Sequence, residues 1–201
     1  GTPLWIIVLV AAVLAPMGID PEIELLQQII QGVFVRNAEK VKEEGTEIDF
    51  HLMHRGFTDI DFFGYKCFNV RNDYELFEAA LKLDPEEYDA VVIHCAFDSS
   101  LDAIRQALDI PVVGVLQAGL LLATMMGYGF GVVTFSRTVV PLIEQTIVRY
   151  GLGDKAVRVR SSESSGEEMM MGLGYAQEII ESFSAAAREC IADGAEVLVP
   201  G

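Results

Sequence analysis

Cys95 is the residue of this sequence best placed to carry out chemistry. It follows a short apolar run over 90–94. The next residues in the chain are Ala96, Phe97 and Asp98. Ser99 and Asp102 then have the spacing of a capping box at a helix N-terminus. A thiol beside the unpaired N–H groups of a helix is favoured as the thiolate, which acts as base or nucleophile. Cysteine is also a common small buried hydrophobe, so position alone leaves a structural role equally open.

The other sulfur and imidazole groups predict no further chemistry. Cys67 lies in a polar loop and Cys190 in an apolar helical pattern, so both are expected to be structural. Three cysteines without C-x-x-C spacing indicate neither a disulfide framework nor a zinc site, and they fit a reducing, cytoplasmic setting. His51 and His54 fall on opposite faces of a predicted strand, so no metal site is expected. His94 points away from Cys95 and is interpreted as a packed histidine.

Two further loops follow predicted strands. Thr134 ends one strand and Ser136 follows it, offering hydroxyls that suit a carboxylate or carbonyl oxygen. Ser136 would serve equally well as the N-cap of a helix over 137–150. Pro16 and Met17 are candidate substrate-binding residues in an apolar loop after the first strand, which has little to offer a charged ligand except backbone amides.

The elements that must position these residues alternate between strand and helix, which predicts an α/β fold. Several apolar runs are short and β-branched, as in buried parallel strands. The predicted strands are 4–14, 48–53, 90–94, 112–116, 131–135, 156–160 and 195–199. The predicted helices are 21–44, 73–83, 99–108, 118–127, 137–150 and 166–193. Ligands of open parallel sheets bind at the carboxyl ends of strands, where Cys95 and Thr134 are expected.

The order of elements repeats, which predicts two pseudo-symmetric halves, each a mainly parallel sheet flanked by helices. The N-terminal half would cover 1–110 and carry the first catalytic cysteine, and the C-terminal half would cover 111–201. Residues 89–94 overlay on 196–201. The counterpart of Cys95 would then be position 202, and a second cysteine is expected to follow Gly201.

Composition limits the classes of partner. The 201 residues are 51% hydrophobic and carry a net charge of −16, which argues against nucleic-acid binding. The apolar run over 4–15 is too short to span a bilayer and is interpreted as a buried strand, so no membrane association is expected. A small-molecule substrate is the expected partner, and the high apolar fraction leaves room for a homo-oligomer.

The sequence resembles the aspartate/glutamate/hydantoin racemase superfamily, and is most similar to its hydantoin racemase branch. The resemblance begins at 91–98, VVIHCAFD, and runs to the closing segment at 194–199. It is also carried by 101–103, 109–114, 117–118, 131–134, 141–144 and 150–152. It implies a two-half, cofactor-independent isomerase in which a cysteine from each half flanks the substrate α-carbon. Cys95 matches the first cysteine of the family.

These observations together predict a racemase acting at a carbon α to a carbonyl, on an amino acid, a hydantoin or a related small acid. Cys95 would be one acid–base group, and the backbone amides of the next three residues would stabilise the enolate oxygen. Thr134 and Ser136 would hold the opposite oxygen. Two alternatives stay open. One is a one-thiol decarboxylase of an activated malonate; the other is a non-catalytic protein that binds a small anion.

Overall fold

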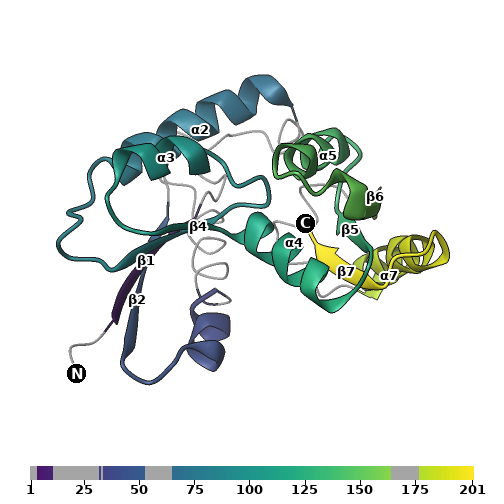
Figure 1. Ribbon diagram of the computed structural model, residues 1–201, viewed down its shortest axis with the longest axis horizontal. Helices are drawn as coiled ribbons and strands as arrows, with labels where there is room; N and C mark the ends of the chain where they lie inside the picture. Colours follow the sequence, from purple (N-terminus) through teal and green to yellow (C-terminus); the bar gives the residue numbers. More distant parts are fainter. Residues whose placement is uncertain (1–3, 11–31, 33, 53–64, 164–176) are drawn as a thin grey trace. The chain divides into compact units, whose positions relative to one another are not determined.

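The computed structural model describes residues 4–10, 32, 34–52, 65–163 and 177–201. The chain forms two compact units. The first contains residues 1–58 and 69–115, and the second contains 59–68 and 116–201. The sequence placed this division near residue 110. Each unit has its own parallel sheet and is described by itself (Figure 1).

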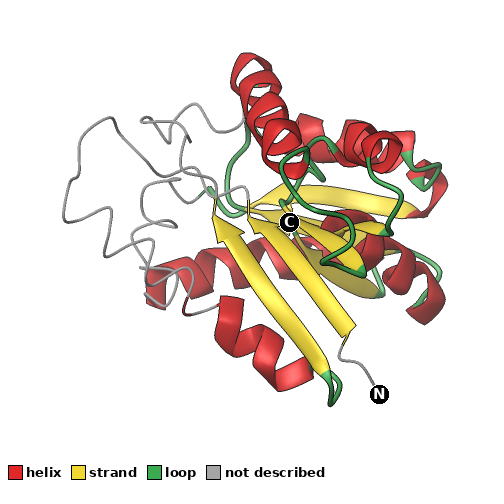
Figure 2. Ribbon diagram, turned by 90° about the vertical axis from the view of Figure 1, so that its left-hand side faces the viewer, coloured by secondary structure: helices red, strands yellow, loops and turns green. Residues whose placement is uncertain are grey.

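The first unit is built on a four-stranded parallel sheet in the order β2-β1-β3-β4 (Figure 2). The strands are β1 (Leu4–Val10), β2 (Thr46–Leu52), β3 (Ala90–His94) and β4 (Val112–Gly114). The helices α2 (Lys66–Ala80) and α3 (Leu101–Ala107) lie beside each other in Figure 1, and residues 34–41 are also helical. Val91 and Ile93 of β3 are fully buried, as expected of a central strand in a parallel sheet.

The second unit is built on a three-stranded parallel sheet in the order β6-β5-β7. The strands are β5 (Phe130–Thr134), β6 (Ala156–Ser161) and β7 (Val197–Pro200). The helices are α4 (Val115–Met126), α5 (Val140–Arg149) and α7 (Gln177–Ala192), with a 3₁₀ turn, η2, at Gly153–Lys155. Every residue of β5 is buried. Gly131 is required there, because a Cβ at this position would lie 2.7 Å from the Cβ of Cys190.

The two units share one strand order and a similar pattern of backbone hydrogen bonds. In each, the first strand lies between the second and the third. Asp89 N donates to Trp5 O at 2.7 Å, and Glu196 N donates to Gly129 O at 3.0 Å. The carboxylate contacts are similar but differ by one position: Asp89 Oδ2 accepts from Trp5 N at 2.7 Å, whereas Glu196 Oε2 accepts from Tyr128 N, one residue before Gly129, at 2.8 Å. The backbone contacts align 89–94 with 196–201. The prediction of an α/β fold with two related parallel sheets is confirmed.

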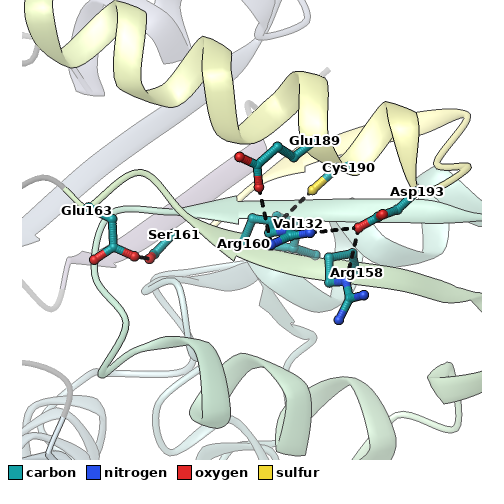
Figure 3. A network of polar contacts seen from close by, with 8 residues as sticks. All are labelled: Val132, Arg158, Arg160, Ser161, Glu163, Glu189, Cys190 and Asp193. Atoms are coloured by element: carbon teal, nitrogen blue, oxygen red, sulfur yellow. Dashed lines mark hydrogen bonds and ion pairs between the residues drawn. The ribbon is translucent and has the colours of Figure 1, made fainter.

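A network of charged side chains fastens α7 to the edge strand β6 (Figure 3). Asp193 Oδ2 lies 3.1 Å from Arg158 Nε and 3.0 Å from Arg160 Nη2, and Arg160 Nη1 lies 3.2 Å from Glu189 Oε2. The two arginines lower the pKa of Asp193. Beneath the network Cys190 is fully buried in an apolar cluster with Val133, Ala186 and Ala195. This placement fits the structural role expected of Cys190.

Several predicted element boundaries are wrong. The helix predicted from 118 begins at Val115, directly after the short strand β4, and the helix predicted from 137 begins at Val140. The helix predicted from 73 begins at Lys66, because polar residues that suggest a loop form its exposed first turns. Among the described residues, no helix is both long and apolar enough to cross a membrane.

Candidate active site

Cys95 lies directly after β3 and is 5% exposed. Its Sγ is 3.3 Å from Ser99 Oγ. The pKa of the thiol is raised, chiefly because burial disfavours the charged form. The Ser99 hydroxyl and the backbone N–H groups of Phe97 and Ser99 oppose this shift, and the carboxylate of Asp98 adds to it. The expectation that this position favours the thiolate is therefore wrong for the protein at rest: desolvation outweighs the hydrogen bonds.

The predicted capping box does not form. The N-cap of α3 is Ser100, one residue later than expected, and it makes no side-chain cap hydrogen bond. Ser99 instead faces the thiol. The sulfur is surrounded by the backbone N–H groups of Phe97 and Ser99 and by the Ser99 hydroxyl, and not by a capped helix N-terminus.

The loop after β3 has a demanding backbone. Asp98 and Ser100 adopt left-handed conformations with φ of 50° and 54°. Such conformations cost free energy in residues other than glycine and cluster at functional sites. Asp98 is 1% exposed and lies against Gly114, where a Cβ would approach the carboxylate carbon to 2.5 Å. Gly114 therefore makes the room that Asp98 occupies.

Two residues of α2 hold this loop in place. Asn72, which is buried, donates from Nδ2 to Ser99 Oγ at 3.5 Å. Asp73 Oδ1 accepts from Ser100 N at 3.2 Å, and the Asp73 carbonyl accepts from the Ser100 hydroxyl. Neither residue was among the predicted site residues. The sequence marks them only weakly, because they are two polar residues within a helix, more than twenty residues before the cysteine.

His94 is packed in the way the sequence predicted. Its ring centroid lies 4.2 Å from that of Phe34, with the rings tilted by 44°. Desolvation lowers the pKa of His94, so the imidazole is neutral near pH 7. The residue supports β3 through packing.

In the second unit, Thr134 occupies the carboxyl end of β5. The residue is fully buried, and its Oγ1 has no hydrogen-bond partner among the described residues. Its carbonyl accepts from Ser162 N at 2.8 Å, which joins the ends of β5 and β6. Buried hydroxyls are nearly always paired, so an unpaired one at a strand end suits a ligand oxygen.

Ser136 is not the N-cap of α5, because Val139 holds that position. Its Oγ lies 3.0 Å from Thr138 Oγ1 and accepts weakly from Thr138 N at 3.4 Å. Close by along the chain, Arg137 Nε is 2.7 Å from Glu163 Oε2. The end of β5 thus carries three hydroxyl-bearing residues and one paired cation.

The structure places the predicted residues as follows. Ala96, Phe97 and Asp98 lie with Cys95 in the first unit, and Thr134 and Ser136 lie in the second. Pro16 and Met17 are outside the described residues. Within the part of the chain that the structure describes, no group of three histidine, cysteine or carboxylate side chains could hold a metal ion.

Comparison with known proteins adds the family. The profile of the Asp/Glu/hydantoin racemase family matches residues 69–201. A hydantoin racemase from Pseudomonas sp. (strain NS671) is 33% identical over 85 residues, 42% of this chain and 34% of the relative. A hydantoin racemase from Rhizobium meliloti is 36% identical over 73 residues, 36% of this chain and 30% of the relative. These matches thus span about a third of the length of either relative.

Solved structures show the same fold. The allantoin racemase from Pseudomonas fluorescens aligns with a TM-score of 0.81 and 21% identity, over 98% of this chain and 76% of that one. The allantoin racemase from Klebsiella pneumoniae aligns with a TM-score of 0.78 and 21% identity, over 98% of this chain and 74% of that one. The family profile covers well over half of the sequence, including Cys95 and Thr134. This chain belongs to the Asp/Glu/hydantoin racemase family.

Proposed function

We propose that the protein is a cofactor-independent racemase of a small cyclic ureide, such as a 5-substituted hydantoin, with Cys95 as one acid–base group. The observation that carries the proposal is the buried Cys95 thiol, surrounded by the Ser99 hydroxyl and two backbone N–H groups at the carboxyl end of β3. The names of the related hydantoin racemases support the substrate class.

The reaction needs one proton to leave a carbon and another to arrive on its opposite face. In the thiolate form, Cys95 takes the proton, so the C–H bond breaks, an S–H bond forms and the electron pair moves to the carbonyl oxygen. The backbone amide of Ala96 would stabilise this enolate oxygen. The roles predicted for the amides of Phe97 and Asp98 do not fit, because the Phe97 N–H faces the Cys95 sulfur and the Asp98 N–H donates to the Cys95 carbonyl at 3.0 Å. In the reverse direction the Cys95 thiol returns the proton, a role that its raised pKa suits.

The second acid–base group is proposed to be a cysteine at position 202. The support is that Asp89 N donates to Trp5 O as Glu196 N donates to Gly129 O, an alignment of 89–94 with 196–201 in which position 202 would be the counterpart of Cys95. Sequencing the gene beyond codon 201 tests this part of the proposal directly. Any residue there that cannot exchange a proton would contradict the two-thiol mechanism.

Thr134 and Ser136 are proposed to bind a second substrate oxygen. The support is the Thr134 hydroxyl, which is fully buried and has no partner among the described residues. A carbonyl oxygen of the substrate would accept this hydrogen bond, which no described residue of the protein accepts. Such a contact fixes the orientation of the ring without taking part in proton transfer.

The test is exchange of the α-proton in heavy water, followed by proton NMR on L-5-benzylhydantoin and on allantoin. We expect the native full-length protein to exchange the α-proton of one of them and to racemise it. Cys95→Ser should slow exchange at least about tenfold, which corresponds to a rise of about 1.4 kcal/mol in the activation free energy. Cys67→Ser is the matched control, because Cys67 is exposed and should leave the rate unchanged. Undiminished exchange in Cys95→Ser would refute the assignment.

One observation favours a second candidate. A thiol that stays protonated at neutral pH is the single proton donor that a decarboxylase of an activated malonate needs to quench its enolate. Release of carbon dioxide from phenylmalonate without racemisation of either ureide would select this function. Binding of a small anion with neither reaction would select the non-catalytic alternative.

A further inference from the structure

Helix α2 contributes a buried polar side chain to the loop that carries Cys95. Asn72 is 6% exposed, and its Nδ2 donates to Ser99 Oγ at 3.5 Å. The next residue of the helix, Asp73, accepts from Ser100 N at 3.2 Å and binds the Ser100 hydroxyl through its carbonyl oxygen. Consecutive residues of α2 thus hold consecutive residues of the loop. The contacts of Asp73 keep Asn72 within reach of Ser99.

The Ser99 hydroxyl is a partner of both the amide and the thiol. Its oxygen also lies 3.3 Å from Cys95 Sγ. A hydroxyl accepts two hydrogen bonds and donates one, whereas the NH₂ group of an asparagine side chain only donates. The Ser99 proton therefore cannot turn toward Asn72 Nδ2. When the sulfur is a thiolate, it is an acceptor within reach of that proton.

The Ser99 hydroxyl is the donor to sulfur that can rotate. The pKa of the Cys95 thiol is raised chiefly by desolvation, and the carboxylate of Asp98 raises it further. The carboxylate of Asp73, on α2, faces the same loop. The Ser99 hydroxyl and the backbone N–H groups of Phe97 and Ser99 oppose the shift. The loop fixes the directions of the two backbone donors, whereas the direction of the hydroxyl proton depends on its other partner.

The residue at position 72 thus decides where the Ser99 hydroxyl donates. We propose that Asn72 is a positioning residue: by donating to Ser99 Oγ, it leaves the hydroxyl proton for the sulfur of Cys95. A donor on Ser99 Oγ also polarises the hydroxyl and strengthens the hydrogen bond that it makes. The inference rests on the acid–base role proposed for Cys95, and it adds a residue that acts on the thiol through Ser99.

Asn72→Asp tests the proposal, because a carboxylate of nearly the same shape accepts hydrogen bonds and does not donate them. The Ser99 proton should then turn to the carboxylate, and the pKa of the Cys95 thiol should rise by at least about one unit. Ultraviolet difference titration of the full-length protein measures the thiolate, and the same substitution in Cys95→Ala is the blank. The acid limb of the pH profile of α-proton exchange should move upward by the same amount, while the plateau at high pH stays. General damage to the site would lower the plateau.

A new negative charge also raises the pKa of a thiol, so the titration is repeated in Ser99→Ala. If Asn72 acts through Ser99, the rise caused by Asn72→Asp should be smaller by at least about one unit in that background. Asn69→Asp is the matched control, because it adds the same charge to α2 about one turn earlier and should shift the pKa far less. Equal rises in both backgrounds, or from either asparagine, would assign the effect to charge alone and overturn the proposal.

Asn72→Leu covers the case in which Asn72→Asp does not fold. It removes the donor without adding charge, so the pKa of Cys95 should rise by roughly 0.2–0.6 unit, and only while Ser99 keeps its hydroxyl. Circular dichroism confirms that each variant is folded. No rise in a folded variant of either kind would overturn the proposal. If the pKa values shift as expected but the native protein exchanges no α-proton, the positioning of the Ser99 hydroxyl is supported and the racemase function fails.

Discussion

Removing the Ser99 hydroxyl should raise the pKa of Cys95 further and slow proton exchange. Ser99 Oγ lies 3.3 Å from the sulfur and accepts from Asn72 Nδ2. When the thiolate forms, the hydroxyl turns its proton toward sulfur while Asn72 continues to donate to its oxygen. A hydrogen bond to a charged group contributes about 1.5–3 kcal/mol. Ser99→Ala should therefore raise the pKa of the thiol by about one to two units.

Exchange should become slower in Ser99→Ala, because only the thiolate form of Cys95 takes the α-proton. Below the pKa, each unit of upward shift reduces the thiolate fraction about tenfold. Exchange at neutral pH should fall by that factor for each unit, while the plateau at high pH stays near that of the native protein. The assays are ultraviolet difference titration of the thiolate, with Cys95→Ala as the blank, and the pH profile of α-proton exchange by NMR.

Two variants separate this role from simple structural damage. Ser99→Thr keeps the hydroxyl and should restore most of the native pKa. Ser182→Ala removes a hydroxyl of α7, in the second unit, that donates to Ile179 O at 2.9 Å, and should leave the thiol unaffected. An unchanged thiol pKa in Ser99→Ala would refute the reasoning, whatever happens to the rate. If Ser99→Ala changes the pKa of Cys95 but the native protein exchanges no α-proton, the Ser99–Cys95 hydrogen bond is supported and the racemase function is rejected.

Three further predictions concern other parts of the two units. Thr134→Val should raise the free energy of unfolding by about 1–3 kcal/mol, because it removes a buried hydroxyl that has no partner in the described part of the chain. The same substitution should raise the KM for substrate. Gly114→Ala should lower the free energy of unfolding by about 1–3 kcal/mol through overpacking. Gly119→Ala should raise the free energy of unfolding by up to about 1 kcal/mol, because its Cβ would lie 3.4 Å from its nearest neighbour. Because the pKa of His94 is lowered, its contribution to stability is present above pH 6.5 and lost as the pH falls below it. His94→Phe should flatten that acid limb in denaturant titrations.

Each of these has an outcome that contradicts it. A lower melting temperature for Thr134→Val would mean that the hydroxyl is paired in solution. Equal melting temperatures for the two glycine variants would mean that Asp98 does not need the space at β4. An acid limb unchanged in His94→Phe would assign the loss of stability to other groups.

The sequence predicted the elements whose composition is unambiguous. The run at 90–94 is β-branched and apolar, and it is β3. Cys95, directly after it, is where a parallel sheet presents ligands. The overlay of 89–94 on 196–201 is matched by equivalent hydrogen bonds in the two sheets. In these cases local pattern and tertiary pairing agree.

The parts that failed depend on contacts between distant residues. The protonation state of Cys95 is set by burial, which the residues beside it in the chain do not reveal. Asn72 reaches Ser99 across 27 residues, so no local motif marks it. The need for Gly114 arises only when the carboxylate of Asp98 is folded against β4. Short-range reasoning found the cysteine at the end of β3 and missed the distant residues that contact the loop after it.

The strand order has a consequence for synthesis on the ribosome. β1 is a central strand, and one of its edges stays unpaired until Ala90–His94 has been made. At about 5–20 residues per second, that wait lasts several seconds. The second sheet is delayed in the same way, because β5 pairs with β7 at Val197–Pro200. An apolar strand with an open edge is prone to join a neighbouring chain. We therefore expect the negative charge of this sequence to matter most before folding is complete, when it keeps nascent copies apart.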